Sequence, residues 1–502
     1  MEFAEGRVVY FARLNPLRAL VVPVVALELA LALGLFAGWE ICRKTRLHYA
    51  PAVHYLFLAL CLAPLGIASV AILRVAPGNL TPVVRAPWFW PAAFLAGAAP
   101  LVWACVHPMR ASHFARRVLL YSWPVLILVL TQAIRVSLLF PPSAYADGPL
   151  AAPLPAPPSH TRVIWIIFDE LSQTTAFGNR RPDLTLPNLD RLRAESFYAA
   201  SAKSPANRTE IALPSLILGE EVLHAEPDGP GDLRVKLSSR ARMASWSSLP
   251  NVFDAARDLG FNTAVVGWFH PYGRVLNRSL TKCYWTAGWL SPGVEEPSSL
   301  EPLIEGMRDR VGLQFLAMPL VGHLPSVFPA SYNVRENLRR FAYLRERARE
   351  IVSDPTVGLA LIHLPIPHPP AIYDKVRGEF TTERRSYVDN VALVDREFGI
   401  LRQSMELAGL WDSSAIVVSA DHGWRTTLWR GTPVWTAEDE AASQQDVTGV
   451  PFLVKLPGRT SGLSYSRPFN TILTRRLITG ILKGEVADAE AVGSFIDKAG
   501  AR

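Results

Sequence analysis

Cysteine is scarce in this chain, with four residues in a length of 502. Cys42, Cys61 and Cys105 lie in or beside long apolar stretches, which leaves Cys283 as the only cysteine in the rest of the sequence. One cysteine cannot form an internal disulfide. The sequence therefore excludes a small extracellular scaffold held together by disulfides.

Charged residues are also few, at 19% of the chain, and no compact tract of Lys and Arg occurs in spite of a formal net charge of +7. Without such a tract we expect no nucleic-acid partner. We interpret the positive excess as basic loops retained on the cytoplasmic side of a membrane, together with affinity for anionic head groups.

Long hydrophobic stretches are abundant in the first third of the sequence. Four of them reach the length of about 20 residues that a bilayer-spanning helix needs, at residues 17–38, 52–73, 88–106 and 118–140. They have almost no polar face, which soluble helices would require, and none is followed by a small-residue cleavage site. We therefore predict a transmembrane region with about four helices in residues 1–140.

The basic residues between these stretches predict an orientation. The first and third loops are basic and the second is less so, with Arg43, Lys44 and Arg46 in the first, Arg110, Arg116 and Arg117 in the third, and Arg74 and Arg85 in the second. The positive-inside rule places the first and third loops in the cytoplasm. Both termini and the large C-terminal part are then outside, although Arg7, Arg13 and Arg18 near the amino terminus oppose this orientation.

The rest of the chain has the pattern of a single α/β domain. Residues 141–160 are rich in Pro and Ala, which is typical of an extended, semi-rigid linker. Strand patterns at about residues 163–168, 262–266, 357–362, 415–419 and 450–455 alternate with helix patterns at about 187–192, 251–259, 332–353 and 385–408. This alternation predicts a mostly parallel central sheet flanked by helices in residues 161–502.

Two predicted strands end in side chains that bind metals. Asp169-Glu170 follows the first strand, and Asp421-His422-Gly423 follows a later one. Open α/β sheets bind ligands at the carboxyl ends of their strands, so these groups are expected at one edge. Taken alone, the second motif fits a solvated turn equally well. Glu170 is expected to support the site or to face solvent.

Two further segments carry reactive groups. Thr209 lies near a predicted helix start, where the helix dipole favours an ionised hydroxyl and a bound phosphate, but an N-cap role explains it as well. His363 and His368 lie in a proline-rich loop after a strand, which suggests contact with a substrate or metal. His270 and Tyr272, at the end of another strand, either line the cleft or form an aromatic packing corner.

Together these motifs resemble the alkaline phosphatase superfamily, in particular its sulfatase-like branch with membrane-bound phosphoethanolamine transferases and lipoteichoic acid synthases. The resemblance covers nearly all of residues 161–482 and rests on the order of Asp169, the Leu-Pro-Asn-Leu-Asp-Arg-Leu run at 186–192, Thr209, the two histidines His363 and His368, and Asp421-His422-Gly423. Those relatives have N-terminal membrane helices, usually five, and an external catalytic domain.

The resemblance implies a role for each matching residue. Thr209 matches the nucleophile, and the metal ligands match Asp169, Thr209, Asp421 and His422, for one divalent cation that is zinc or manganese. His368 matches a histidine that helps hold the transferred phosphate, and His363 lies in the same motif, so we expect both to bind the substrate. The transferases usually have Glu where this chain has Asp169.

The implied activity is metal-dependent phosphotransfer through a phosphothreonine. A head group such as phosphoethanolamine or phosphoglycerol would pass from a phospholipid donor to an envelope glycan or lipid, with the protein in the bacterial inner (cytoplasmic) membrane and its catalytic domain periplasmic. The alternatives are a membrane-anchored phosphodiesterase or other sulfatase-like hydrolase that uses water, and a non-catalytic envelope protein that binds no metal.

The sequence departs from the family pattern in two places. No histidine follows His422, where many relatives have one, and we expect Arg425, or less directly Arg430, to contact the substrate instead. Ser215 stands where phosphoethanolamine transferases usually have a cysteine. A sulfatase is disfavoured because Thr209 cannot be converted to formylglycine.

Overall fold

The computed structural model describes residues 102–103, 105–121, 142–155, 161–287, 329–432, 434–443, 448–458 and 462–500, and six single residues, Tyr10, Ala37, Ile41, Lys44, Thr45 and His54. The chain divides into two compact units. The larger unit comprises Met1–Asn15, Pro142–Glu296 and Ser326–Arg502, and the smaller comprises Pro16–Pro141 and Pro297–Pro325.

In the smaller unit the described structure is mainly one helix, α6 (Pro108–Tyr121). The four predicted membrane spans fall almost wholly outside the described residues. Within the described part of the chain, no helix combines the length and the apolar character needed to cross a bilayer. The spans therefore stay a prediction.

The larger unit is built on an eight-stranded sheet, with the order β14-β2-β13-β12-β1-β9-β7-β8. Its strands are β1 (Arg162–Phe168), β2 (Phe197–Ala199), β7 (Thr263–Phe269), β8 (Lys282–Ala287), β9 (Leu359–Leu364), β12 (Ser414–Ser419), β13 (Phe452–Lys455) and β14 (Leu463–Tyr465). All the neighbouring strands pair in parallel except β13, which is antiparallel to both β12 and β2. The prediction of a mostly parallel sheet is confirmed.

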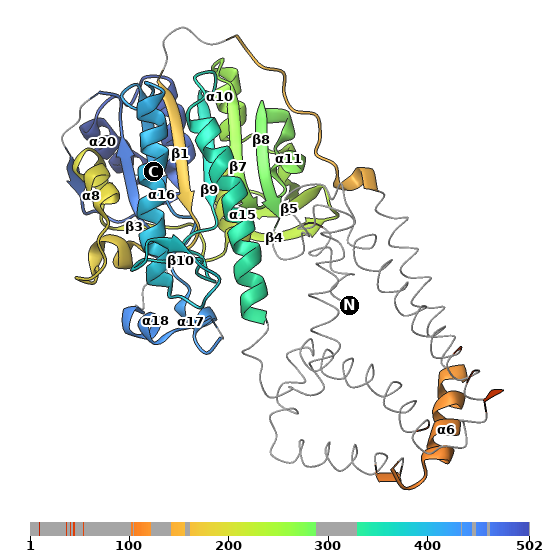
Figure 1. Ribbon diagram of the computed structural model, residues 1–502. Helices are drawn as coiled ribbons and strands as arrows, with labels where there is room; N and C mark the ends of the chain where they lie inside the picture. The colour runs from red at the N-terminus through yellow and green to blue at the C-terminus, as the bar shows by residue number, and fades with distance from the viewer. Residues whose placement is uncertain are drawn as a thin grey trace. The chain divides into compact units, whose positions relative to one another are not determined.

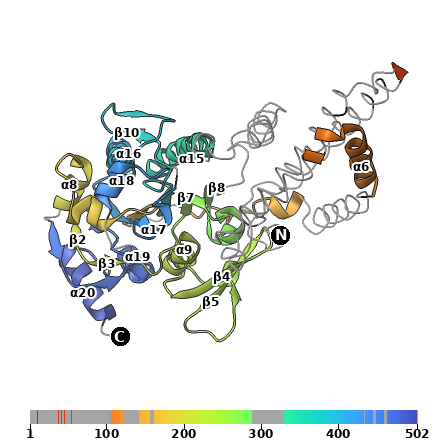
Figure 2. The same ribbon diagram turned by 90° about the horizontal axis from the view of Figure 1, so that it is seen from below.

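Helices cover both faces of this sheet, as predicted (Figures 1 and 2). On one face α15 (Pro329–Val352) packs against α16 (Tyr387–Leu407), which contacts α8 (Pro187–Ala194). On the other, α19 (Thr474–Leu482) contacts α9 (Thr209–Leu218) and α10 (Val252–Asp258). Every residue of the central strands β1, β9 and β12 is buried, as expected for parallel strands covered on both sides.

Smaller elements complete the unit. The strands β4 (Val222–Asp228), β5 (Asp232–Leu237) and β6 (Ala244–Ser245) form a separate sheet, and β3 (Ala202–Lys203), β10 (Tyr373–Asp374), β11 (Glu379–Phe380) and β15 (Phe469–Asn470) form two-stranded pairs. The remaining α-helices are α11 (Tyr272–Val275), α17 (Thr426–Trp429), α18 (Ala437–Ala442) and α20 (Ala489–Gly500). Short 3-10 or π-helical turns span Pro142–Tyr145, Thr174–Gly178, Trp246–Ser248, Asn277–Ser279 and Thr471–Leu473.

The Pro/Ala-rich segment is more closely attached to the larger unit than a free spacer would be. The backbone amide of Gly148 donates to the carbonyl of Gly273 at 2.9 Å. The side-chain amide of Asn262 pairs with both backbone polar groups of Leu154, at 2.8 and 3.0 Å. The described part of the segment therefore runs along the sheet edge that β7 and β8 form.

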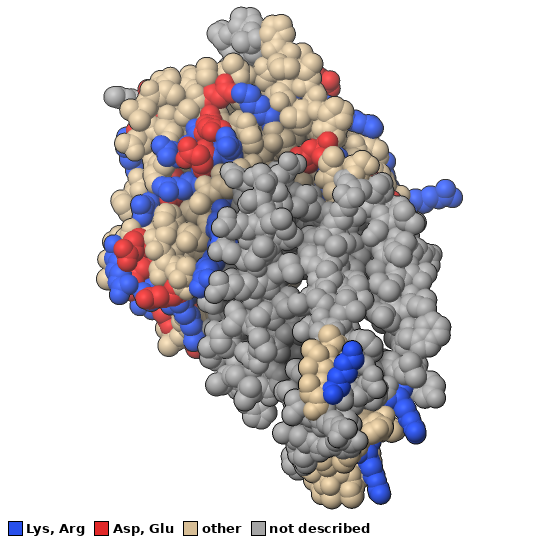
Figure 3. All heavy atoms as spheres, turned by 45° about the vertical axis from the view of Figure 1, so that its right-hand side comes forward, with Lys and Arg blue, Asp and Glu red and all other residues tan. Residues whose placement is uncertain are grey.

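The surface charges of this unit are mixed. In the face shown in Figure 3, Lys and Arg side chains lie among Asp and Glu side chains over the described residues. Ion pairs between exposed side chains, such as Arg347–Glu350 at 2.7 Å, belong to this pattern. Pairs of this kind contribute little to stability, about 0–1 kcal/mol each.

Candidate active site

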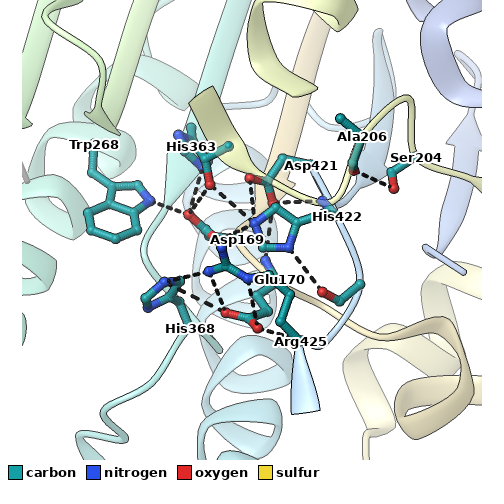
Figure 4. A network of polar contacts seen from close by, with 12 residues as sticks. Asp169, Glu170, Ser204, Ala206, Trp268, His363, His368, Asp421, His422 and Arg425 are labelled. Carbon is teal, nitrogen blue, oxygen red and sulfur yellow. Dashed lines mark hydrogen bonds and ion pairs between the residues drawn. The ribbon is translucent and has the colours of Figure 1, made fainter. Parts of the chain in front are cut away.

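The predicted site residues meet at the carboxyl ends of four neighbouring strands (Figure 4). Asp169 follows β1, Asp421 and His422 follow β12, and both strands pair directly with each other. His363 lies in β9, on the other side of β1, and Trp268 lies in β7 beside it. The sheet thus brings together groups that are far apart in the sequence.

Asp169 is the centre of the site and is completely buried. Its Oδ2 accepts a hydrogen bond from the indole Nε1 of Trp268 at 2.7 Å and lies 3.5 Å from Nε2 of His363. Its Oδ1 lies 3.6 Å from Nε2 of His422. Burial alone would raise the pKa of Asp169, but the charge of His368 and the contacts with His363 and His422 outweigh it and hold that pKa well below its usual range.

Three buried ligand atoms at this point lack a hydrogen-bond partner among the described residues: Oδ1 of Asp169, Nε2 of His363 and Oδ2 of Asp421. Leaving such an atom unpaired costs about 1–3 kcal/mol, and a bound cation would give all three a partner. These three residues can offer ligand atoms within 4.8 Å of one another, and so can Asp169, Glu170 and His422. Carboxylates and imidazoles of this kind fit a divalent cation such as zinc or manganese.

Neighbouring groups orient the ligand atoms. Nδ1 of His422 lies 3.0 Å from the carbonyl of Gly423, which we assign as a donated hydrogen bond that leaves the Nε2 lone pair facing Asp169. Nδ1 of His363 lies 3.2 Å from the hydroxyl of Tyr272. Oδ1 of Asp421 accepts hydrogen bonds from two backbone amides, which leaves Oδ2 for the cluster. We call Asp169, His363, Asp421 and His422 the ligand cluster.

The hydroxyl of Thr209 faces this cluster. Thr209 is the first residue of α9 and is 4% exposed. The N-cap position belongs to Arg208, so the alternative that Thr209 is only a cap is wrong. Its Oγ1 lies 3.2 Å from Nε2 of His422 and 3.5 Å from Oδ2 of Asp169. The structure therefore joins the hydroxyl with the ligands that the sequence predicted beside it.

The backbone of Thr209 rests on a buried histidine. Nε2 of His270 lies 3.3 Å from the carbonyl of Thr209, and its Nδ1 lies 3.0 Å from the hydroxyl of Tyr10. Burial raises the pKa of Tyr10 well above its usual value and lowers that of His270 to about 3. At neutral pH a protonated tyrosine thus donates to a neutral imidazole, which donates to Thr209. The guanidinium of Arg274 also binds the Tyr10 carbonyl, at 3.2 Å.

His270 and Tyr272 are completely buried, so neither lines a cleft. They form the aromatic packing corner that was the other prediction, since the His270 ring contacts those of Trp246, Phe269 and Tyr272. From there they also contact Thr209 and His363. Sequence reasoning missed these roles and also missed the contact of Trp268 with Asp169. One signal for them was present: Gly267 lies opposite His363 in the sheet, and a Cβ there would come within 2.5 Å of the Tyr272 ring. A glycine at this place lets the ring reach the histidine.

A second cluster of charged groups borders the first. Oε1 of Glu170 accepts hydrogen bonds from the backbone amide of Arg425 at 2.6 Å and from Nε1 of Trp429 at 2.9 Å. Nη2 of Arg425 lies 3.2 Å from Oε2 of Glu170 and 3.1 Å from Nε2 of His368. Burial lowers the pKa of Arg425, but Glu170 outweighs it, so this pKa is raised and the guanidinium stays charged.

The structure shows where the charged residues next to the two strand-end motifs lie. Glu170 is completely buried, so the expectation that it could face solvent is wrong, and its backbone holds a φ of 67°, which is uncommon for a residue with a side chain. Arg425 comes to the site, whereas Arg430 pairs with Glu440 at 2.9 Å on the surface. His363 was expected in the loop after its strand, but β9 continues through Leu364 and carries it into the ligand cluster.

We expect Glu170→Gln to lower turnover about tenfold, which corresponds to about 1.4 kcal/mol of transition-state stabilisation. Glutamine keeps an oxygen for Trp429 but removes the charge that orients the Arg425 guanidinium. Steady-state kinetics on a phosphodiester, the substrate class that the family resemblance implies, would measure the loss. Glu440→Gln is the matched control because it removes the exposed partner of Arg430, and unchanged turnover is expected there. Equal turnover of both variants would contradict the role given to Glu170.

No protein-family model matches the chain, and no curated protein matches it in sequence. Solved structures with some similarity to the chain are known. The phosphonate monoester hydrolase of Agrobacterium radiobacter is 16% identical, with a TM-score of 0.38 over 64% of this chain and 77% of that one. A 2-O GAG sulfatase is 12% identical, with a TM-score of 0.39 over 64% and 71%.

A protein in the alkaline phosphatase superfamily from Vibrio parahaemolyticus is 12% identical, with a TM-score of 0.37 over 66% of this chain and 69% of that one. At such identities, and with TM-scores below 0.5, these likenesses carry no conclusion about activity. What the chain does has to be inferred from its own site.

Proposed function

We propose that this chain is a metal-dependent phosphotransferase of the sulfatase-like alkaline phosphatase superfamily, with Thr209 as its nucleophile. The observation that supports this most directly is the position of the Thr209 hydroxyl, 3.2 Å from Nε2 of His422 and 3.5 Å from Oδ2 of Asp169, beside three unpartnered ligand atoms. A structural threonine needs neither a buried carboxylate nor an imidazole at its hydroxyl.

Asp169, Asp421, His422 and the Thr209 hydroxyl would hold one divalent cation, zinc or manganese, and His363 offers a further ligand atom. Such a cation, when bound, lowers the pKa of the hydroxyl and polarises a phosphoryl oxygen. The unpartnered atoms Oδ1 of Asp169, Oδ2 of Asp421 and Nε2 of His363 support this assignment because each one gains a partner.

In the first half-reaction Thr209 attacks the substrate, with Arg425 and His368 beside it. The Thr209 oxygen attacks the phosphorus of a phosphodiester in line, and the bond from phosphorus to the leaving alcohol breaks. The hydroxyl, ionised when a cation is bound, has released its proton to water before the attack, and His368 would donate a proton to the leaving alcohol. Arg425 and His368, 3.1 Å apart, present a fixed positive charge and an imidazole to the phosphoryl oxygens and the leaving group.

In the second half-reaction a hydroxyl of an acceptor takes the phosphoryl-linked group from the phosphothreonine and regenerates Thr209. The proposed donor is a phospholipid with a head group such as phosphoethanolamine or phosphoglycerol, and the proposed acceptor is an envelope glycan or lipid. The apolar stretches in residues 1–140 support a place in the bacterial inner membrane, with the catalytic unit periplasmic.

Hydrolysis is the second candidate function. It shares the whole first half-reaction, and nothing in the geometry around Thr209 distinguishes an alcohol from water as the incoming group. A membrane-anchored phosphodiesterase or phosphonate hydrolase would use the same residues in the same order. The two functions differ only in their products.

Product analysis tests the proposal. We expect the full-length protein, given phosphatidylethanolamine or phosphatidylglycerol with a labelled head group and an envelope glycan or lipid, to release diacylglycerol and to label the acceptor. Diacylglycerol together with a free phosphorylated head group would establish the hydrolase instead. If neither lipid is cleaved and no phosphothreonine forms at Thr209, neither function holds for these donors.

A further inference from the structure

A cavity of about 410 Å³ lies beside the segments that carry the site. Its polar lining comes from the loop after β1, helix α8 and the turn between β2 and β3: Gln173, Thr174, Arg193, Tyr198, Ser201 and Lys203. The volume is within the range of small-molecule sites, about 300–1,000 Å³. None of the ligand cluster lines it.

Among the residues that the structure describes, two cations line this cavity and no acidic residue does. Neither Arg193 nor Lys203 forms an ion pair with any residue that the structure describes. The guanidinium of Arg193 instead lies over the Tyr198 ring, 4.2 Å from its centroid, which fixes the side chain. Arg191 on the same helix differs, since it pairs with Glu195 at 3.2 Å. The cavity therefore presents positive charge that no described carboxylate neutralises.

A buried amide adds a specific polar group. Gln173 is 6% exposed, and its Nε2 donates to the Tyr198 hydroxyl at 2.6 Å. Its Oε1 is buried without a hydrogen-bond partner among the described residues, and reversing the amide would leave the nitrogen in that place instead. Thr174 and Ser201, which both carry hydroxyls, line the same cavity. A ligand with several hydroxyls would pair with polar side chains of this lining, such as those of Thr174 and Ser201.

The cavity is tied to the site through the backbone. Gln173 belongs to the segment that follows Asp169, and its backbone amide donates to the carbonyl of Gly449 at 3.2 Å. Lys203 pairs with Gly449 as well, and from Lys203 the chain runs directly to Thr209. A molecule in the cavity therefore contacts both the segment that follows Asp169 and the segment that leads to Thr209.

We propose that this cavity binds an anionic sugar, and that it is the subsite for the acceptor glycan. The charge of Arg193 and Lys203 selects the anion, and the amide and hydroxyls select the sugar. The binding of the sugar follows from the cavity alone, whereas its role as an acceptor subsite rests on the proposed phosphotransferase function.

Glucosamine 6-phosphate is the probe for the test. Its binding is measured by calorimetry on the full-length protein carrying Thr209→Val, with a chelator present so that the ligand cluster holds no cation. We expect Arg193→Gln and Lys203→Gln each to weaken binding about tenfold or more. Arg191→Gln, on the same helix but paired with Glu195, is the matched control and should bind like the parent. Glucosamine without the phosphate should bind at least tenfold more weakly.

Several results would overturn the proposal. If the Arg193→Gln and Arg191→Gln variants bind with equal affinity, the sugar phosphate does not bind in this cavity. The same conclusion follows if the parent protein melts at its normal temperature and binds no glucosamine 6-phosphate. If inorganic phosphate binds as tightly as the sugar phosphate, the cavity does not recognise the sugar. Arg193-dependent binding in a protein whose wild type neither transfers nor hydrolyses would leave the cavity standing and reject the proposed function alone.

Discussion

Replacing Thr209 by valine should reduce turnover by about 10⁴-fold or more, because the proposed nucleophile, which would form the covalent intermediate, is lost. Valine keeps the shape and the branched Cβ of threonine. The Thr209 hydroxyl does not cap helix α9, so the change should alter the free energy of unfolding by less than about 1 kcal/mol. Steady-state turnover of labelled phospholipid and mass spectrometry for phosphothreonine measure the effect, and a thermal melt checks the fold.

A second threonine at a helix start provides the control. Thr474 is the first residue of α19, is 1% exposed, and donates to the carbonyl of Thr471 at 2.6 Å. Thr474→Val should cost about 1 kcal/mol of stability and leave turnover unchanged. Thr209→Ser should keep part of the turnover, since it keeps a hydroxyl. Turnover in Thr209→Val at the wild-type rate would show that another group is the nucleophile.

Asp421→Asn should lower the affinity for the divalent cation about 10²-fold or more, and turnover at limiting metal should fall with it. Oδ1 of Asp421 already accepts from two backbone amides, so only Oδ2, buried and unpartnered, remains for the metal. Asparagine can keep the hydrogen bonds from the two backbone amides but offers no negative charge to the metal. Metal analysis and thermal melts with added zinc or manganese measure the change.

The melts separate metal binding from folding. Ligand that binds only the folded state raises its melting temperature, so added metal should stabilise the wild type, and a chelator should reverse this. Asp421→Asn should show little response. Asp395→Asn is the control, because Asp395 is a buried carboxylate that binds the amide of Leu189 at 2.7 Å and the side chain of Asn188 at 2.9 Å, away from the site. It should lose stability and keep its metal response. Equal metal content in wild type and Asp421→Asn would refute the ligand assignment.

Much of the fold was predictable because local signals agree with it. The β-branched runs of β1 and β12 lie in buried strands, and the boundaries of α10 and α16 are marked by capping boxes at Asn251 and Ser386. The positions of Asp169 and Asp421 followed from one rule, that parallel strands end at a common edge. The antiparallel direction of β13 had no such signal.

Other features depend on partners that no local pattern reveals. The end of β9 is set by its pairing with β1, where His363 lies opposite Ile167, so the strand continues past the point where its apolar run stops. Glu170 meets Arg425 across 255 positions of sequence, and neighbouring residues do not encode which partner a buried carboxylate finds. The attachment of the Pro/Ala-rich segment through Asn262 is of the same kind.

The contact of Tyr10 with His270 constrains the path of the chain through residues 16–141. Its hydroxyl reaches His270 in the larger unit, so Tyr10, which precedes the first apolar stretch, belongs to the same compact body as the described residues from Pro142 onward. A chain that leaves this body at about residue 16 and returns at about residue 142 must come back to the side from which it left. If the apolar stretches between those points cross a bilayer, an even number of crossings is expected, and the four predicted spans fit this.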